Sequence, residues 1–312
     1  MSDILQESFQ KLIEQFDAVT GQDDSYAVTT ENELKSIWPE QGDDEIMVHV
    51  YEGDKRMEPF HRHDYFFFDY AYRNNHQSIS DFDGNLITIH ENECYIGQPF
   101  SGHAIRSIQG EDAVIIGIRI KRDAFIKHFL PALSKDFYLF HFFLDPDKDE
   151  HLDGYIHLAF EDPTVIRMLL EMIVIEYAHS KEDTQSILRS MLTTLLMYVS
   201  RVYRDNMKKG PKRPLVYKIL EYIYTHLDTA TLRSTAECFA YHPNYLSNLL
   251  HAEMGKTFSE IILSSRMERA ALFLQNTELS IDDIALMIGY KSSASFYRAF
   301  KRYYGVSPRE YK

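Results

Sequence analysis

The segment Ile281–Tyr311 has a residue pattern that is typical of two short helices joined by a tight turn. An apolar row at helical spacing comes first, and Gly289 then permits a turn. A second helical pattern begins near Ser292 and places Phe296 and Phe300 on one face. The segment therefore predicts a helix-turn-helix. The apolar row of its first helix consists of Ile281, Ile284, Ala285 and Ile288.

A second copy of this pattern lies about 50 residues upstream. Its turn runs from Ala240 to His242, and Pro243 follows at a position that the first turn of a helix tolerates. Between the copies, an amphipathic helix of about 16 residues spans roughly 24 Å. Two helices on such a spacer could enter successive major grooves of DNA, which recur every ~34 Å. The apolar positions are Leu232, Ala236, Phe239, Leu246, Leu249 and Leu250 in the motif, and Phe258, Ile262, Ala270, Phe273 and Leu274 in the spacer.

The region 214–312 resembles the DNA-binding domain of the AraC/XylS family of bacterial transcription regulators. Arg266 and Ala270 fit the linker helix of that family. The first motif departs from the family pattern at His242, where serine is common, and at Leu250, where phenylalanine is common. The residues that fit the second motif in register are Gly289, Tyr290, Ser295, Phe296, Arg298, Phe300, Lys301, Gly305, Pro308 and Tyr311.

The resemblance implies which side chains contact DNA. Arg298 lies one turn beyond the start of its helix, where a guanidinium can reach guanine O6 and N7. Asn244 and Asn248, four residues apart on one face, can each pair with adenine edges or phosphate. Ala294 offers only its methyl group. The expected DNA-binding residues are Asn244, Ser247, Asn248, His251, Lys291, Ser293, Ala294, Arg298, Lys301 and Arg302.

Some of these basic residues also have a simpler interpretation. Lys301 and Arg302 could form an ordinary solvated helix face, and Arg266 is interpreted as a structural ion-pair partner rather than as a DNA contact. For Arg298 the DNA-binding interpretation is preferred, because of its position on the second helix.

Charge is divided unevenly along the chain, whose net charge is -14. Residues 210–312 hold 13 Lys and Arg against 10 Asp and Glu, a net charge of +3, so the preceding residues hold 20 against 37, a net charge of -17. A basic face favours phosphate contacts, whereas an acidic domain is repelled from DNA. The charges therefore predict a DNA-binding C-terminal domain and a sensor that lies away from the duplex.

Length and composition predict two or three compact units in a reducing compartment. The chain has 312 residues, and the basic stretch 205–214 is the best boundary. No long uncharged apolar run occurs, and the acidic N-terminus does not resemble an export signal. Cys94 and Cys238 fall in different predicted domains, so a disulfide framework is not expected. The expected location is the cytoplasm.

The N-terminal half contains short β-rich segments separated by turn residues. These segments predict a barrel or jelly roll, and residues 59–66 and 98–105 resemble the cupin-like sensor domain found in many AraC-family regulators. Small barrels of this kind can enclose one small ligand. The residues expected to bind it are His61, His63, Tyr65, Phe67 and His103.

His61, His63 and His103 also raise a metal hypothesis, because His-x-His places two imidazoles on one face of a strand. Metal-binding cupins add a glutamate where this chain has Phe67 and Phe68. The alternatives are that His61 and His63 are polar residues of the barrel rim, hydrogen-bonded to the backbone, and that the histidines contact an organic ligand. No metal or other cofactor is therefore assigned from the sequence.

Three further segments have helical periodicity: residues 1–22, 163–179 and 184–203. The first is interpreted as a packed cap, with a regulatory arm as the alternative. The other two either pack on the barrel or form a dimer interface, and the resemblance favours the second use for part of their surface. Their apolar rows are Val165, Met168, Leu169, Met172 and Ile173, then Ile187, Met191, Leu195, Tyr198 and Val202.

The sequence thus predicts an α+β chain, with a cupin-like β-barrel and helical dimerisation segment before an all-α double helix-turn-helix domain. The expected domains are a helical segment at 1–43, a sensor barrel at 44–145, dimerisation helices at 146–204, a linker at 205–213 and an AraC-type DNA-binding domain at 214–312.

The expected function is ligand-responsive, sequence-specific regulation of transcription, by activation, and not enzymatic catalysis. The expected partners are a double-stranded DNA operator, a small-molecule inducer such as a sugar or other metabolite, RNA polymerase and a second copy of the chain, with no membrane. Two alternatives stay open: a constitutive DNA-binding regulator whose barrel only dimerises, and a cupin enzyme fused to a DNA-binding domain.

Overall fold

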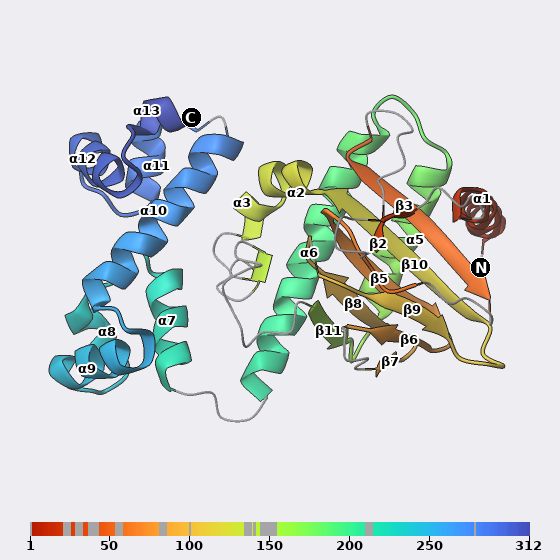
Figure 1. Cartoon of the computed structure of the whole chain (residues 1–312), viewed down its shortest axis with the longest axis horizontal. Coiled ribbons are helices and arrows are strands. Elements are labelled where there is room, and N and C mark those ends of the chain that lie inside the picture. Colours follow the sequence, from red (N-terminus) through yellow and green to blue (C-terminus); the bar gives the residue numbers. More distant parts are fainter. Residues whose placement is uncertain are drawn as a thin grey trace. The chain divides into compact units, whose positions relative to one another are not determined.

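The computed structural model describes residues 2–20, 26–28, 34–36, 44–53, 59–80, 86–99, 101–133, 139, 142–143, 155–209, 215–277 and 279–312. The chain forms two compact units, one comprising Met1–Phe125 and Phe142–Tyr203, the other Ile126–His141 and Arg204–Lys312. The division after Tyr203 lies next to the expected linker at 205–213. Strands are confined to the first unit, among the described residues, and helices dominate the second (Figure 1). The fold is α+β, as predicted.

The N-terminal unit contains three hydrogen-bonded sheets. The largest has the strand order β11-β8-β5-β10-β3, the second β7-β6-β9 and the third β1-β2-β4. The strands are β1 (Tyr26–Val28), β2 (Leu34–Ser36), β3 (Ile46–Gly53), β4 (His61–Arg62), β5 (Tyr65–Arg73), β6 (His76–Ile79), β7 (Leu86–Ile89), β8 (Glu93–Gly97), β9 (Ala104–Ser107), β10 (Ala113–Lys121) and β11 (Tyr155–Ala159).

The expected barrel is not closed among the described strands. β3 and β11 form the edges of the largest sheet, and no described ladder joins either of them to β6, β7 or β9. A closed barrel needs an unbroken ring of paired strands. The packed sheets still enclose an aromatic core, formed by Tyr65, Phe67, Ala71, Ile89 and Tyr95.

Helices of the N-terminal unit pack on the largest sheet. The first, α1 (Asp3–Thr20), packs against β3 and α5 (Thr164–Ala178), as Figure 1 shows. The Lys11 ammonium donates a 2.6 Å hydrogen bond to the Ala178 carbonyl, and the rings of Phe9 and Tyr72 lie 5.0 Å apart. The prediction of a packed N-terminal cap is therefore confirmed.

The apolar row chosen on α5 from the sequence differs from the row that the fold buries. The buried residues are Ile166, Leu170, Ile173, Val174 and Ala178. Val165, Met168 and Met172 are exposed instead. Apolar residues surround most of this helix, so periodicity alone could not distinguish the two faces. The next helix, α6 (Thr184–Lys209), is fixed to β3 by Gln185, whose amide oxygen accepts hydrogen bonds from the backbone of Glu45 and Ile46.

The C-terminal unit is built around one long helix, α10, of 19 residues. One cluster of helices packs near the start of α10 and includes α7, α8 and α9. A second cluster packs near its end and includes α11, α12 and α13. The helices are α7 (Leu215–Thr225), α8 (Leu232–Cys238), α9 (Pro243–Met254), α10 (Phe258–Asn276), α11 (Ile281–Met287), α12 (Ser293–Tyr304) and α13 (Pro308–Tyr311).

Two short helices, α2 (Arg122–His128) and α3 (Leu130–Leu133), follow β10. Across the described part of the chain, every helix is too short or too polar to cross a membrane.

Candidate nucleic-acid interface and effector site

Helices α9 and α12 occupy the same position in two copies of one motif. In each helix, two fully buried residues four positions apart hold one face against the rest of the unit. They are Leu246 and Leu250 in α9, and Phe296 and Phe300 in α12. Both helices end at a glycine with left-handed φ, 62° at Gly255 and 80° at Gly305. The predicted repeat of the helix-turn-helix is therefore confirmed by matching packing and matching helix ends.

The two turns differ by one residue. In the first motif Ala240 has a φ of 56°, and in the second Gly289 has a φ of 87°. The following amides, of Tyr241 and Tyr290, donate to the carbonyls of Ala236 and Ala285 in the preceding helices. These bonds close a Schellman-type helix end in each motif. The second turn contains the additional residue Lys291 before its cap, so an exposed cation stands beside the start of α12.

Different residues cap the two helices. Nδ1 of His242 accepts a hydrogen bond from the Asn244 amide at the start of α9. The Ser292 hydroxyl accepts one from the Ser295 amide at the start of α12. An unpaired amide at a helix N-terminus needs an acceptor, and a neutral imidazole provides one. The departure from serine at His242 therefore preserves the cap.

Arg266, on α10, fixes the two motifs to one another. Its guanidinium donates to the Leu227 carbonyl at 2.7 Å and 3.0 Å, and also contacts the Asp228 carbonyl. It lies over the Tyr290 ring, 5.5 Å from the centroid. Leu227 and Asp228 precede the first motif, whereas Tyr290 belongs to the turn of the second. The structural interpretation of Arg266 is therefore confirmed.

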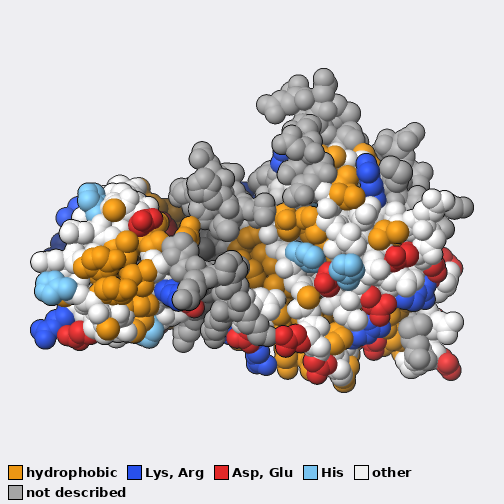
Figure 2. Space-filling view, turned by 90° about the horizontal axis from the view of Figure 1, so that it is seen from below, with side chains coloured by type: hydrophobic (Ala, Val, Ile, Leu, Met, Phe, Trp, Pro, Cys, Tyr) orange, Lys and Arg blue, Asp and Glu red, His pale blue; other side chains and the backbone are white. Residues whose placement is uncertain are grey.

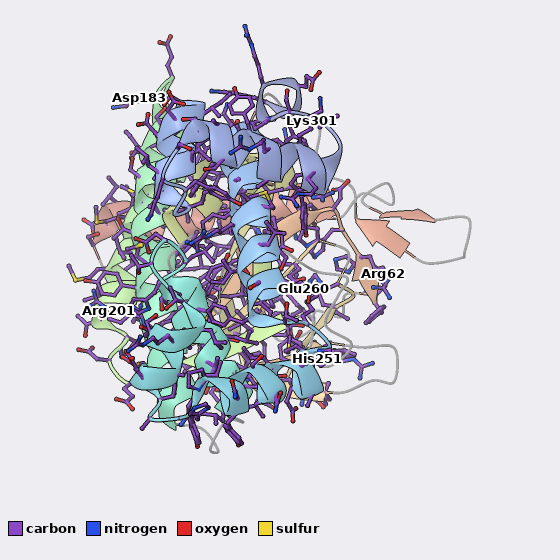
Figure 3. The ribbon with its side chains drawn as sticks, turned by 90° about the vertical axis from the view of Figure 1, so that its left-hand side faces the viewer. Arg62, Asp183, Arg201, His251, Glu260 and Lys301 are labelled. Carbon is purple, nitrogen blue, oxygen red and sulfur yellow. The ribbon has the colours of Figure 1, made fainter. Side chains whose placement is uncertain are left out.

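Most of the predicted DNA-binding side chains are exposed, in α9 and α12 or beside them. Figure 3 shows α10 running between the two ends of the unit, with α12 and Lys301 at one end and α9 and His251 at the other. Ser247 and Ser293 are half-buried, and the Ser293 hydroxyl donates to the Asp282 carboxylate of α11. The exposed members are Asn244, Asn248, His251, Lys291, Ala294, Arg298, Lys301 and Arg302.

Two aromatic residues at the start of α9 were not selected from the sequence. Tyr241 and Tyr245 are exposed, and their rings stack with centroids 4.9 Å apart. In Figure 2 the visible face of the C-terminal unit has a hydrophobic area. Asp and Glu side chains are spread over the visible face of the N-terminal unit. An aromatic residue one position from Asn244 is the sequence signal that could have drawn attention to Tyr245.

The N-terminal unit brings the five predicted ligand residues together. The backbones of His61 and His103 pair through two 3.0 Å hydrogen bonds. His63 Nε2 lies 3.3 Å from His103 Nδ1. Tyr65 stacks on His63 with centroids 4.1 Å apart, and Phe67 stacks on His103 at 4.2 Å. All five side chains are buried.

Backbone carbonyls orient two of the imidazoles. Nδ1 of His61 lies 2.9 Å from the Pro59 carbonyl, and Nδ1 of His63 lies 2.9 Å from the Tyr65 carbonyl. Both histidines therefore bond to the backbone as the first alternative expected, but they are buried rather than placed at a rim. Burial lowers the pKa of His63 and of His103 well below the ordinary value, and the nearby charge of His61 acts in the same direction. Both imidazoles are therefore neutral near pH 7.

The space beside this cluster is small. The cavity is lined by residues of four strands and the histidine segments, and its volume is about 10 Å³. That is close to the smallest volume that holds one water molecule. The Phe67 ring crosses Gly97, where any side chain would overlap it. The lining residues are His49, His63, Tyr65, Phe67, Asp69, His103, Ile105 and Arg119.

A family model described as a helix-turn-helix domain matches residues 235–312. Among curated relatives, the uncharacterised HTH-type transcriptional regulator YtdP of Bacillus subtilis is 40% identical over 82 residues. These residues are 26% of this chain and 11% of that protein, so the chain matches only a small part of its relative.

Two solved structures are also similar. The C-terminal domain of AraT, a response regulator from Geobacillus stearothermophilus, is 38% identical and covers 33% of this chain and 86% of that one, with a TM-score of 0.31. ToxT from Vibrio cholerae is 16% identical and covers 86% of this chain and 97% of that one, with a TM-score of 0.35. Because both TM-scores are low, these two similarities give no information about function.

Proposed function

We propose that this chain, whose C-terminal region is an AraC-type helix-turn-helix domain, regulates transcription by reading two successive major grooves of one DNA site. The observation that carries the proposal is the pair of exposed reading helices, α9 and α12, held on one scaffold. α10 has 19 residues and therefore spans about 28 Å. This length is comparable to the ~34 Å repeat of the major groove on one face of the duplex.

The second reading helix supplies both kinds of DNA contact. Arg298 is exposed on α12 between the buried Phe296 and Phe300, and we propose that it reads a base edge. Lys301, three residues further along the helix, is proposed to contact phosphate. Asn248 has the equivalent position to Arg298 in α9, fifty residues earlier. Tyr245 is proposed to add an apolar or phosphate contact at the start of α9.

Replacing Lys301 with Ala is expected to weaken binding to all DNA sequences alike and to reduce the salt slope by about one unit, because one phosphate contact is lost. Titrations of specific and scrambled duplexes over a range of salt concentrations measure both effects. Arg309→Ala, an exposed cation on α13, is the matched control and should leave the slope unchanged. A variant that loses affinity only for the specific duplex would show that Lys301 reads a base.

The N-terminal unit is proposed to act as the sensor of the regulator. Its buried cluster of His61, His63, Tyr65, Phe67 and His103 is the proposed effector site. Effector binding would alter DNA binding only by its differential affinity for two states of the chain. The role proposed for this unit is therefore binding rather than catalysis.

The exposed apolar stripe on α5 is proposed to pair with a second copy of the chain. Val165, Met168 and Met172 follow one another at helical spacing, and Met168 is 58% exposed. A self-complementary apolar stripe suits a symmetric dimer, in which each copy buries the same face. Dimerisation would raise DNA affinity by linking two DNA-binding domains.

Replacing Met168 with Glu is expected to raise the dimer dissociation constant at least about tenfold, since a charge would be desolvated in the interface. Sedimentation equilibrium without DNA measures this constant. Met287→Glu, at a similarly exposed methionine of α11, is the control and should leave the dimer intact. A parent chain that is monomeric at micromolar concentration would contradict the proposed interface.

The cytoplasm is the proposed site of action, and activation is the proposed sign of regulation, with RNA polymerase as a further partner. A transcription reporter downstream of a selected DNA site tests the sign, since an activator raises expression when it binds. Reduced expression would instead assign the chain as a repressor.

A further inference from the structure

The three histidines of the sensor cluster bring ring nitrogens close to one another, and His63 Nε2 and His103 Nδ1 share a hydrogen bond. A carbonyl oxygen can only accept a hydrogen bond, so Nδ1 of His61 and Nδ1 of His63 carry hydrogens directed at Pro59 and Tyr65. Nδ1 of each ring is thus committed to the backbone, and a metal ion would bind through Nε2. Metal-binding histidines are oriented in this way, because the bond from the other ring nitrogen fixes the tautomer and the ring position.

The spacing of these nitrogens fits a metal ion. At Zn–N distances of ~2.0 to 2.1 Å, two ligands at tetrahedral positions lie about 3.3 to 3.4 Å apart. His63 Nε2 and His103 Nδ1 are 3.3 Å apart in their hydrogen bond, and an ion bound to both nitrogens would displace the shared proton. One nitrogen from each of His61, His63 and His103 falls within a mutual distance of 4.8 Å. The third ligand therefore needs a shift on the order of 1 Å to complete the set.

The backbone holds the ligand positions in place before any ion binds. His61 and His103 come from different parts of the sequence, yet their amides and carbonyls pair reciprocally. Rings of Tyr65 and Phe67 stack on His63 and His103. Such support reduces the entropy lost when the ligands are ordered around an ion.

The volume of the cavity distinguishes between two kinds of ligand, an ion and an organic molecule. Pockets for small organic molecules have volumes of ~300 to 1,000 Å³, whereas this one has about 10 Å³. The cavity has room for one ion or one water molecule beside His63 and His103. A sugar or an aromatic metabolite does not fit without rearrangement of the aromatic core.

The charges around the cavity are mixed. Asp69 lies on the same face of β5 as Tyr65 and Phe67, and its carboxylate favours a bound cation. The Arg119 guanidinium, on β10, opposes one and lies 5.6 Å from the centroid of the Tyr65 ring. His49 on β3 completes the titratable groups of the described lining. Because Asp69 offsets Arg119, the lining itself contributes little net charge against a cation.

We propose that His61, His63 and His103 bind one divalent first-row transition-metal ion, and that this ion is the effector of the regulator. The effector role rests on the function proposed above, whereas the metal site does not. Three imidazoles without a thiolate suit Zn²⁺, Cu²⁺, Ni²⁺ or Fe²⁺.

The site is tested with the full chain, without an affinity tag, after chelator treatment and dialysis against Zn²⁺. The expected result is one Zn²⁺ per chain, and Co²⁺ in its place should give the intense visible absorption of a tetrahedral complex. His63→Gln and His103→Gln should each lose the bound ion and this absorption. His76→Gln, at a buried histidine of β6 outside the cluster, should retain both.

Circular dichroism shows whether the variants are folded. If His63→Gln and His103→Gln both unfold, the measurement on the parent chain still tests the site. Binding of less than half an equivalent of Zn²⁺ and of Co²⁺ by the parent chain would overturn it. Loss of the ion from His76→Gln as well would also overturn it, since binding would then not depend on the three named ligands.

The effector role is measured separately, as DNA affinity at fixed salt with chelator and with Zn²⁺. The expected change is roughly fivefold or more, the lower range of allosteric couplings. Stoichiometric Zn²⁺ with unchanged DNA affinity would overturn the effector role and leave the site intact. Specific DNA binding without any metal uptake would overturn the site and leave the proposed function intact. Metal uptake without DNA binding would overturn the proposed function and, with it, the effector role.

Discussion

The double variant Asn248→Ala, Arg298→Ala is expected to bind its specific DNA site ~2 to 6 kcal/mol more weakly than the parent. Each side chain is exposed on its own reading helix, and loss of a good base contact costs ~1 to 3 kcal/mol. The two losses should add, because the residues belong to different motifs and share no partner. Each single variant should therefore lose about half of this free energy.

Titration at one fixed salt concentration, with a specific and a scrambled duplex, measures these losses. Asn248→Ala removes no charge, so its affinity for the scrambled duplex should change far less than its affinity for the specific duplex. Arg309→Ala controls for the loss of a positive charge elsewhere in the unit. If either single variant kept the affinity of the parent for the specific duplex, that reading helix would not contact bases as proposed.

Replacing Gly289 with Ala is expected to destabilise the C-terminal unit by about 2 to 5 kcal/mol. Gly289 has a φ of 87°, and a left-handed backbone costs an L-residue ~1 to 2 kcal/mol. A Cβ atom there would also lie 2.6 Å from the Cα and carbonyl oxygen of Asp228 and 2.7 Å from the Arg266 guanidinium. Crowding of this kind costs ~1 to 3 kcal/mol, because backbone cannot move aside cheaply.

Gly255→Ala is a matched control for the cost of placing an L-residue in a left-handed backbone. Gly255 also has a left-handed φ, 62°, but a Cβ there meets nothing within 4 Å. The Gly255→Ala variant should lose only ~1 to 2 kcal/mol of unfolding free energy. Urea unfolding measures both variants, and the difference between them reports the contact that joins the two motifs. Equal losses would mean that the approach of Asp228 to Gly289 does not constrain the unit.

The helix-turn-helix repeat could be predicted from sequence because local signals coincide there. Helical periodicity, turn residues and caps all indicate the same boundaries, so α9, α11 and α12 were predicted closely. The contact between Arg266 and the Leu227 carbonyl could be named only as a structural role, since its partner lies 39 positions away. Such pairings depend on tertiary packing that a single sequence does not encode locally.

The N-terminal unit was predicted less completely. The long strands β3, β5 and β10 have strong β-forming runs, whereas β4 has two residues and β6 and β9 have four each. Short strands give too little periodicity to detect. The described sheets do not close into a barrel, and the sequence could not decide between packing and an interface for the apolar row of α5, because both features depend on which elements meet.

The proposed effector cluster could also be predicted only in part. His-x-His placed His61 and His63 near each other, and the resemblance added His103. The cavity volume could not be inferred, because it depends on how Phe67 packs across Gly97 and on how Tyr65 stacks. That volume is what favours an ion over an organic inducer in the proposed site.

The central claim is that one chain reads two successive major grooves, and hydroxyl-radical and base-methylation footprinting on a DNA site selected from random sequence tests it most directly. We expect two protected major-groove segments about one helical turn apart on the same face of the duplex for each bound chain. The Asn248→Ala variant should lose methylation protection in one segment, and Arg298→Ala in the other. Protection of a single groove per chain, or failure of any sequence to be enriched, would contradict the account.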